Sequence, residues 1–271
     1  MNEVGIIHFD ASPVANLGEL VGRYRPGEFE SPYRSTVPLL ALLRDGQSVL
    51  RQILIACNIS TPVSLHFESR VGPPRGRGTP SHTDLLVLSD RASLAVEVKW
   101  SEPRYETVSA WFDGAAASKT SKSPGHYDSP GNRPEVLKGW HDLLVQHAPK
   151  ASGLSDFSDT VYQMVHRAAS SCAWQRSPQL AYLQFSPLPT GEQPDSNQLW
   201  HDLEQLHKLL GSPYDFPFHL IEVPIKATPS FEKLRQLEKG SPMTGQWVRQ
   251  GLLNEMLFEF GCPQIRTLRG T

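Results

Sequence analysis

Glu97 and Lys99 are two charged residues inside an otherwise apolar run, "ASLAVEVKW", from Ala92 to Trp100. Side chains alternate between the two faces of a β-strand, so these two would share one face and Val98 would lie on the other. A carboxylate beside an ammonium group can bind a cation and stabilise developing negative charge. The pair therefore indicates hydrolytic chemistry, provided that a second acidic group lies nearby.

A second apolar run, "HTDLLVLS", precedes this segment, and the polar break at Asp90 and Arg91 predicts a hairpin between the two runs. Its register would place Asp84 opposite Glu97, with Cβ atoms roughly 4.5–5.5 Å apart. Because two carboxylates this close repel each other, we expect a hard divalent cation between them. The same register pairs Leu88 with Ser93, Leu86 with Ala95 and His82 with Lys99.

The cation that fits best is Mg²⁺, for which Mn²⁺ can substitute. Mg²⁺ prefers oxygen ligands and is bound by one or two protein carboxylates together with substrate phosphate. Asp84 and Glu97 would be the ligands, and Lys99 would assist the attacking water. The opposite face of the hairpin should belong to the hydrophobic core, because it is apolar throughout: Leu85, Val87, Leu94, Val96, Val98 and Trp100.

Asp84, followed after twelve intervening residues by the triplet Glu97, Val98 and Lys99, resembles the PD-(D/E)XK nuclease superfamily. The resemblance covers roughly residues 36–187. It implies a restriction-endonuclease-like fold, in which a helix precedes a four-stranded mixed core sheet and another helix links its third and fourth strands. It also implies a Mg²⁺-dependent endonuclease, a phosphodiester hydrolase that acts on nucleic acid, with DNA favoured. The sequence departs from the pattern at Thr83, where the name-giving proline would stand.

Two further residues are candidate supports of this site. Several branches of the superfamily carry a glutamine on the helix after the lysine strand, and "VYQMVHRAA" offers Gln163. An acid from the first helix is also common, but 36–57 contains only Asp45, so Glu68 at the end of the first strand is the better candidate. The polar stripe Gln163, His166, Arg167 and Ser170 fits a solvated helix face equally well.

Phosphate contacts would come from a local set of basic residues, because a net charge of −2 does not suggest a broad nucleic-acid surface. The candidates are Arg75, Arg77, Lys119 and Lys122. The two arginines lie in a glycine- and proline-rich loop, and the two lysines lie in 113–134, which we expect to be a long flexible excursion. Such contacts would position nucleic acid rather than read its sequence.

The elements that must position these residues alternate between helix and strand, which predicts an α/β fold with a mixed sheet of about five strands flanked by helices. We expect a single domain over 1–271, with an N-terminal arm at 1–35, a core at 36–187 and an extension at 188–271. The expected elements are a helix or helical hairpin at 36–57 with a break at Gly46, strands at 63–68, 179–186 and 218–225, and helices at 134–147, 156–174, 196–210 and 243–260.

Composition excludes several other classes. No run approaches the roughly 20 apolar residues of a membrane span, and the start lacks the pattern of a signal peptide, so we expect a cytoplasmic protein without membrane contact. Three widely separated cysteines fit neither a disulfide framework nor a zinc knuckle. A homodimer remains open. The alternative to a nuclease is a non-catalytic nucleic-acid-binding or assembly module that keeps the nuclease fold.

Overall fold

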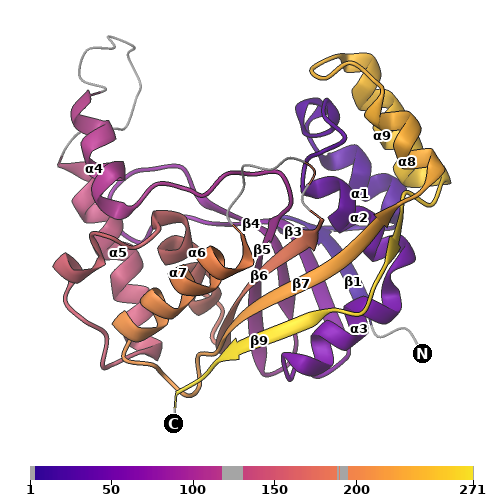
Figure 1. Ribbon diagram of the computed structural model, residues 1–271. Coiled ribbons are helices and arrows are strands. Elements are labelled where there is room, and N and C mark those ends of the chain that lie inside the picture. Colours follow the sequence, from indigo (N-terminus) through magenta and orange to yellow (C-terminus); the bar gives the residue numbers. More distant parts are fainter. Residues whose placement is uncertain (1–3, 118–130, 188, 190–194, 271) are drawn as a thin grey trace.

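A mixed sheet runs through the centre of the molecule in the computed structural model, which describes residues 4–117, 131–187, 189 and 195–270 (Figure 1). Within these residues the sheet has nine strands, in the order β2-β1-β3-β4-β5-β6-β7-β8, with β9 also paired to β7. The strands are β1 (Val4–Phe9), β2 (Ser12–Val14), β3 (Val63–Val71), β4 (Ser81–Leu88), β5 (Ala92–Lys99), β6 (Ser177–Ser186), β7 (Phe218–Ala227), β8 (Phe258–Phe260) and β9 (Gln264–Leu268).

The centre of the sheet changes direction at β5. Strands β3, β4 and β5 are antiparallel neighbours, whereas β5, β6 and β7 run parallel. Parallel neighbours need crossover connections, and the helices between β5 and β7 supply them. The carboxyl ends of β5 and β6 therefore lie at the same edge of the sheet.

Helices cover both faces of the sheet, as Figure 1 shows, and each layer packs on its own hydrophobic core. One layer contains α1 (Leu17–Arg23), α2 (Thr36–Asp45), α3 (Gln47–Ala56), α8 (Pro229–Arg235) and α9 (Pro242–Asn254). The other contains α4 (Val108–Ala117), α5 (Asn132–His147), α6 (Tyr162–Cys172) and α7 (Ser196–Leu209). The expected α/β architecture, a mixed sheet flanked by helices, is confirmed.

The hairpin register is confirmed near the turn, where Leu88 pairs with Ser93 and Leu86 with Ala95. The predicted helical hairpin is also present, because α2 and α3 are separated at Gly46. The face of the β4–β5 hairpin that was predicted to be apolar lies in the core beneath α2 and α3; its members are Leu85, Val87, Leu94, Val96, Val98 and Trp100.

Four strands beyond the expected five come from short or weakly patterned segments. Residues 1–35, expected to form an arm, instead provide β1 and β2, and β1 pairs parallel with β3. The helix expected at 243–260 ends at Asn254, because 258–260 forms β8 against β7. The final strand, β9, pairs with the other half of β7. These segments form strands because they pair with strands that are distant in the sequence, and such pairing cannot be predicted from the local pattern.

Both ends of the excursion expected at 113–134 are helical, because α4 continues to Ala117 and α5 begins at Asn132; the part between, 118–130, lies outside the described residues. Lys119 and Lys122 lie outside the described residues. In the part of the chain that the structure describes, no helix combines the length and apolar character needed to cross a membrane.

Candidate functional site

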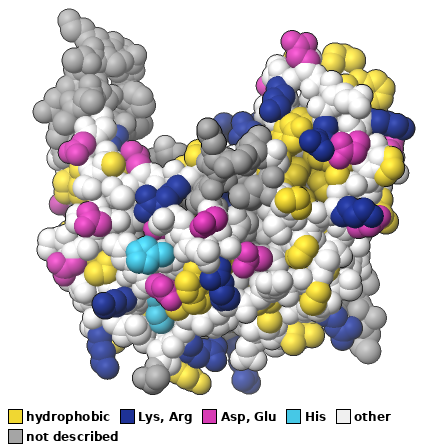
Figure 2. All heavy atoms as spheres, viewed as in Figure 1, with side chains coloured by type: hydrophobic (Ala, Val, Ile, Leu, Met, Phe, Trp, Pro, Cys, Tyr) yellow, Lys and Arg dark blue, Asp and Glu magenta, His cyan; other side chains and the backbone are white. Residues whose placement is uncertain are grey.

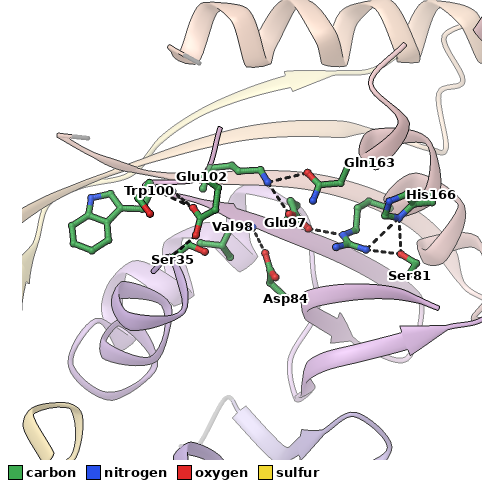
Figure 3. Close-up of polar contacts among 12 residues, drawn as sticks. Ser35, Ser81, Asp84, Glu97, Val98, Trp100, Glu102, Gln163 and His166 are labelled. Atoms are coloured by element: carbon green, nitrogen blue, oxygen red, sulfur yellow. Dashed lines mark hydrogen bonds and ion pairs between the residues drawn. The ribbon is translucent and has the colours of Figure 1, made fainter. Parts of the chain in front are cut away.

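The β4–β5 ladder opens just before the acidic residues. Its last pair is Leu85 with Val96, and beyond it Asp84 and Glu97 do not form the ladder pair expected from the sequence. Instead, an Asp84 carboxylate oxygen accepts a hydrogen bond of 2.7 Å from the backbone N–H of Val98 (Figure 3). The Asp84 side chain therefore lies against the backbone of β5, close to where Glu97 leaves it.

Glu68 on β3 lies opposite Asp84 on β4. The pairs Phe67–Leu85 and Ser69–Thr83 bracket these two residues and set them opposite each other. Glu68 has a φ of 52°, in the left-handed region that side chains other than glycine rarely adopt. Such strain persists only where the surroundings hold it, and it is concentrated at functional sites. Glu68, Asp84 and Glu97 thus lie on the neighbouring strands β3, β4 and β5, and the first two are directly opposed.

Glu97 is held between two cations. One carboxylate oxygen accepts a hydrogen bond of 2.9 Å from Lys99 Nζ, and the other accepts one of 2.5 Å from Arg167 Nε. All three side chains are buried, with Glu97 only 3% exposed. Figure 3 shows the carboxylate lying between the ammonium and the guanidinium groups. A buried charge requires such partners, because leaving it unpaired would be strongly destabilising.

Helix α6 supplies the other half of this network. Gln163 Oε1 accepts a hydrogen bond of 2.9 Å from Lys99 Nζ, so the predicted proximity of Gln163 to the lysine is present. Arg167 lies four residues later, on the same face of the helix. Met164, Val165 and Ala168 anchor α6 in the core, which directs Gln163 and Arg167 toward β5.

Arg167 and Ser81 are site residues that the sequence prediction did not select. Arg167 Nη1 donates to Ser81 Oγ at 2.6 Å, and Ser81 Oγ lies 2.9 Å from His166 Nδ1. The spacing of Gln163 and Arg167 was visible in the polar stripe on 163–170, but the same spacing is typical of solvated helix faces. Only the burial of that face, on α6 against the sheet, distinguishes the two cases.

The two carboxylates have opposite pKa shifts. Burial and the charges of Glu97 and Glu68 raise the pKa of Asp84 well above its ordinary value, against the opposing effects of Arg167 and the Val98 N–H. Burial also acts to raise the pKa of Glu97, but Arg167 and Lys99 outweigh it and hold that pKa below its usual range. Glu97 is therefore the more acidic member of the pair, and Asp84 binds a proton more readily.

Three carboxylates, those of Glu68, Asp84 and Glu97, are the donors that this site offers to a metal ion. Among the described residues, no three His, Cys, Asp or Glu side chains are arranged as a complete metal site. Mg²⁺ needs only one or two carboxylates, however, because water and substrate oxygens complete its shell. The hydroxyls of Tyr24 and Tyr182 are buried and have no hydrogen-bond partner within the described part of the chain. Burial raises the pKa of both tyrosines well above its ordinary value, with smaller contributions from Glu68 and Asp84 for Tyr24 and from Glu97 for Tyr182.

A cleft of about 460 Å³ opens beside the charged network. Gln163 and Arg167 form part of its wall, and Arg77 and Arg133 add positive charge. On the face shown in Figure 2, by contrast, basic and acidic side chains are interspersed and form no continuous basic surface. Positive charge on this face is therefore scattered among acidic groups.

The two candidate arginines of the loop before β4 differ in position. Arg77 lines the cleft, and its backbone N–H donates to Asn132 Oδ1 at 2.7 Å. Arg75 instead forms an ion pair with Asp142 on α5. The loop lies directly on α5, because Gly139 has no side chain: a Cβ there would be 2.7 Å from the backbone N of Arg75.

The comparisons with known proteins identify a family but no function. A family model described as a domain of unknown function (DUF6946) matches residues 17–219, a span that contains Glu68, Asp84, Glu97, Lys99 and Gln163. No curated protein and no solved structure matches the chain. Because the family model covers more than half of the 271 residues, the chain belongs to the DUF6946 family.

Proposed function

We propose that the protein is a metal-dependent nuclease that hydrolyses phosphodiester bonds, with DNA as its substrate. The observation that carries the proposal is the convergence of Asp84, Glu97, Lys99 and Gln163 at one end of β4 and β5. These are the residues that the PD-(D/E)XK resemblance selects. The order of elements also supports it, since α3 precedes β3, β4, β5 and β6, and α6 lies between the last two strands.

Asp84 and Glu97 would hold a Mg²⁺ ion, with Glu68 as a further support. When bound, Mg²⁺ supplies Lewis-acid polarisation of the phosphodiester and favours ionisation of the attacking water. Lys99 contributes a buried positive charge, which stabilises the negative charge that develops on the phosphate during attack. Gln163 accepts from the Lys99 ammonium and so fixes its direction.

Arg167 has a second role in this mechanism. It bonds Glu97 and also lines the cleft that a phosphate would enter. A guanidinium binds phosphate oxygens in the same planar geometry as carboxylate oxygens. Arg167 would therefore bond both Glu97 and a substrate phosphate oxygen, and part of the Glu97 carboxylate would be available to hold a cation.

A plasmid-nicking assay tests the proposal. Supercoiled plasmid is incubated with wild type, Asp84→Asn or Glu259→Gln, in Mg²⁺ or in chelator. Glu259 is an exposed carboxylate paired with Lys226, so Glu259→Gln controls for the loss of one acidic group. We expect nicking by wild type and Glu259→Gln in Mg²⁺ alone, and none by Asp84→Asn. Nicking that persists in chelator, or that survives in Asp84→Asn, would contradict the assignment.

The second candidate function is a non-catalytic nucleic-acid-binding or assembly module. One observation favours it: both carboxylate oxygens of Glu97 already have partners, in Lys99 and Arg167. A complete ionic network of this kind could hold α6 against the sheet without turnover. The same reactions separate the two functions when run on a native gel, because a shift of the plasmid without nicking supports the binding module.

A further inference from the structure

Tyr105 lies between Lys99 and the cleft, on the segment that links β5 to α4. Lys99 Nζ is 4.6 Å from the centroid of the Tyr105 ring, so one face of the ring covers the ammonium. The residue is nevertheless 46% exposed and forms part of the cleft wall. A ring that is covered by a cation on one face and exposed to this extent offers its other face to a ligand.

Hydrogen bonds fix the chain both before and after Tyr105. Glu102 accepts hydrogen bonds from the backbone N–H groups of Ser35, Trp100 and Ser101 at 3.0–3.1 Å. Arg104 donates two hydrogen bonds, of 2.8 and 3.0 Å, to the buried carboxylate of Asp202 on α7.

After Tyr105 in the chain, the backbone carbonyl of Glu106 accepts a hydrogen bond of 3.0 Å from the N–H of Tyr162. A platform held in this way loses little conformational freedom when a ligand stacks on it.

The other aromatic rings described in the cleft wall are already covered. Trp111 and Tyr162 stack on each other with centroids 3.8 Å apart, and Arg133 lies 5.0 Å above the Trp111 ring. Trp140 is only 1% exposed. The open aromatic face of Tyr105 thus adjoins a wall that carries three guanidinium groups, those of Arg77, Arg133 and Arg167.

We propose that this cleft receives one unpaired nucleotide of single-stranded DNA, with its base stacked on the outer face of Tyr105. Bases in a duplex expose only their edges in the grooves, so a protein ring can stack only on a base that is unpaired. The cleft volume, about 460 Å³, lies within the range of small-ligand sites. The inference rests on the proposed function and deepens it, because the phosphate attached to the stacked nucleotide would be the one placed near Lys99.

Fluorescence anisotropy tests the stacking without requiring cleavage. The probes are a fluorescein-labelled oligothymidylate and a labelled duplex of equal length, both in chelator. The proteins are wild type, Tyr105→Ala, Tyr105→Phe and Tyr214→Ala. Tyr214 is a matched control, because it is 58% exposed and also has a cation, Arg269, over its ring.

We expect Tyr105→Ala to bind the single strand roughly 10- to 100-fold more weakly, the effect of losing one base stack. Tyr105→Phe keeps the ring face and should bind like wild type, as should Tyr214→Ala. Duplex binding should be unchanged in every variant. Equal single-strand affinity of Tyr105→Ala and wild type, or an equal loss for the duplex, would overturn the inference.

The anisotropy measurement and the nicking assay can fail independently of each other. A wild-type protein that nicks plasmid in Mg²⁺ while Tyr105→Ala binds the single strand normally remains a nuclease and refutes only the stacking role. A protein that binds single strands through Tyr105 but cleaves neither the plasmid nor the oligothymidylate in Mg²⁺ refutes the nuclease and supports the stacking role.

Discussion

Two buried polar clusters lie at opposite ends of the same sheet. In the first, on β6, β7 and β9, the His219 ring contacts Gln179 Oε1 and Thr267 Oγ1, each at 3.0 Å. In the second, Glu97 contacts Lys99 and Arg167. The first cluster is complete with neutral groups, whereas the second contains two cations and one anion. The second cluster therefore depends on paired buried charges, and the loss of one charge leaves the others without a partner.

Removal of the anion should give the largest difference between the clusters. Glu97→Gln leaves Lys99 and Arg167 buried without a counter-charge, and we expect a loss of about 3–5 kcal/mol in the free energy of unfolding. Gln179→Leu in the neutral cluster leaves one ring nitrogen unpaired and should cost about 1–3 kcal/mol. Urea unfolding at neutral pH measures both. Equal losses would mean that the charge of the second cluster has no special cost.

Lys99→Met should separate chemistry from metal binding. The variant keeps much of the aliphatic volume but loses the ammonium, so we expect cleavage to fall roughly 10²- to 10³-fold. Its affinity for Mn²⁺ should stay that of wild type, whereas Glu97→Ala should lose both cleavage and Mn²⁺ binding. Calorimetric titration with Mn²⁺ measures the affinities, and Lys226→Met controls for the loss of one exposed lysine. Equal affinity in wild type and Glu97→Ala would remove Glu97 from the metal site.

The neutral cluster should be the acid-sensitive one. Burial, with a smaller effect from Arg269, lowers the pKa of His219 from 6.5 to about 4. Between these values the unfolded chain binds the proton and the folded chain does not, so stability falls as the pH falls from 6.5 to 4. The total loss from this residue is about 3 kcal/mol at 1.36 kcal/mol per pKa unit.

His219→Gln keeps polar groups at this position but cannot titrate. Unfolding free energies measured at several pH values should therefore show a shallower acid loss in His219→Gln than in wild type. Parallel curves for the two proteins would contradict the assignment of this loss to His219.

Asp84→Asn should have a smaller effect. Asparagine can still accept the hydrogen bond from Val98 and removes repulsion with Glu97 and Glu68. We expect the variant in chelator to melt at or above the wild-type temperature, although most substitutions of partly buried polar groups cost about 0.5–3 kcal/mol. Millimolar Mg²⁺ should raise the melting temperature of wild type alone. A variant that melts well below wild type, with neither protein responding to Mg²⁺, would make Asp84 a structural acceptor.

The smallest effect concerns the loop before β4. Arg77 lines the cleft, so Arg77→Ala should reduce the slope of log binding constant against log salt by about 0.7 for single-stranded DNA. Arg75 is engaged by Asp142, so Arg75→Ala should change the slope less. Anisotropy titrations at several salt concentrations compare the two variants. An unchanged slope in Arg77→Ala would remove this loop from the interface.

Local sequence pattern predicted the features of the fold that depend on residues close together in the chain. Alternation identified the buried face of the β4–β5 hairpin, and the turn at Asp90 fixed the register as far as Leu85 and Val96. It could not predict that the ladder ends before the next pair, where the Asp84 carboxylate accepts a hydrogen bond from the backbone N–H of Val98. Arg167 was missed for a related reason, since its partner Glu97 lies 70 residues away.

Gly139 gives the cleft a property that is independent of its chemistry. The loop that carries Arg77 lies on α5 only because position 139 has no side chain, and a methyl group there would press on the backbone of Arg75. Backbone atoms cannot swing aside as a flexible side chain can, so the loop as a whole would have to move. Position 139 thus determines how closely the Arg77 loop, which forms part of the cleft wall, can approach α5, and it does so independently of the residues that would cleave the substrate.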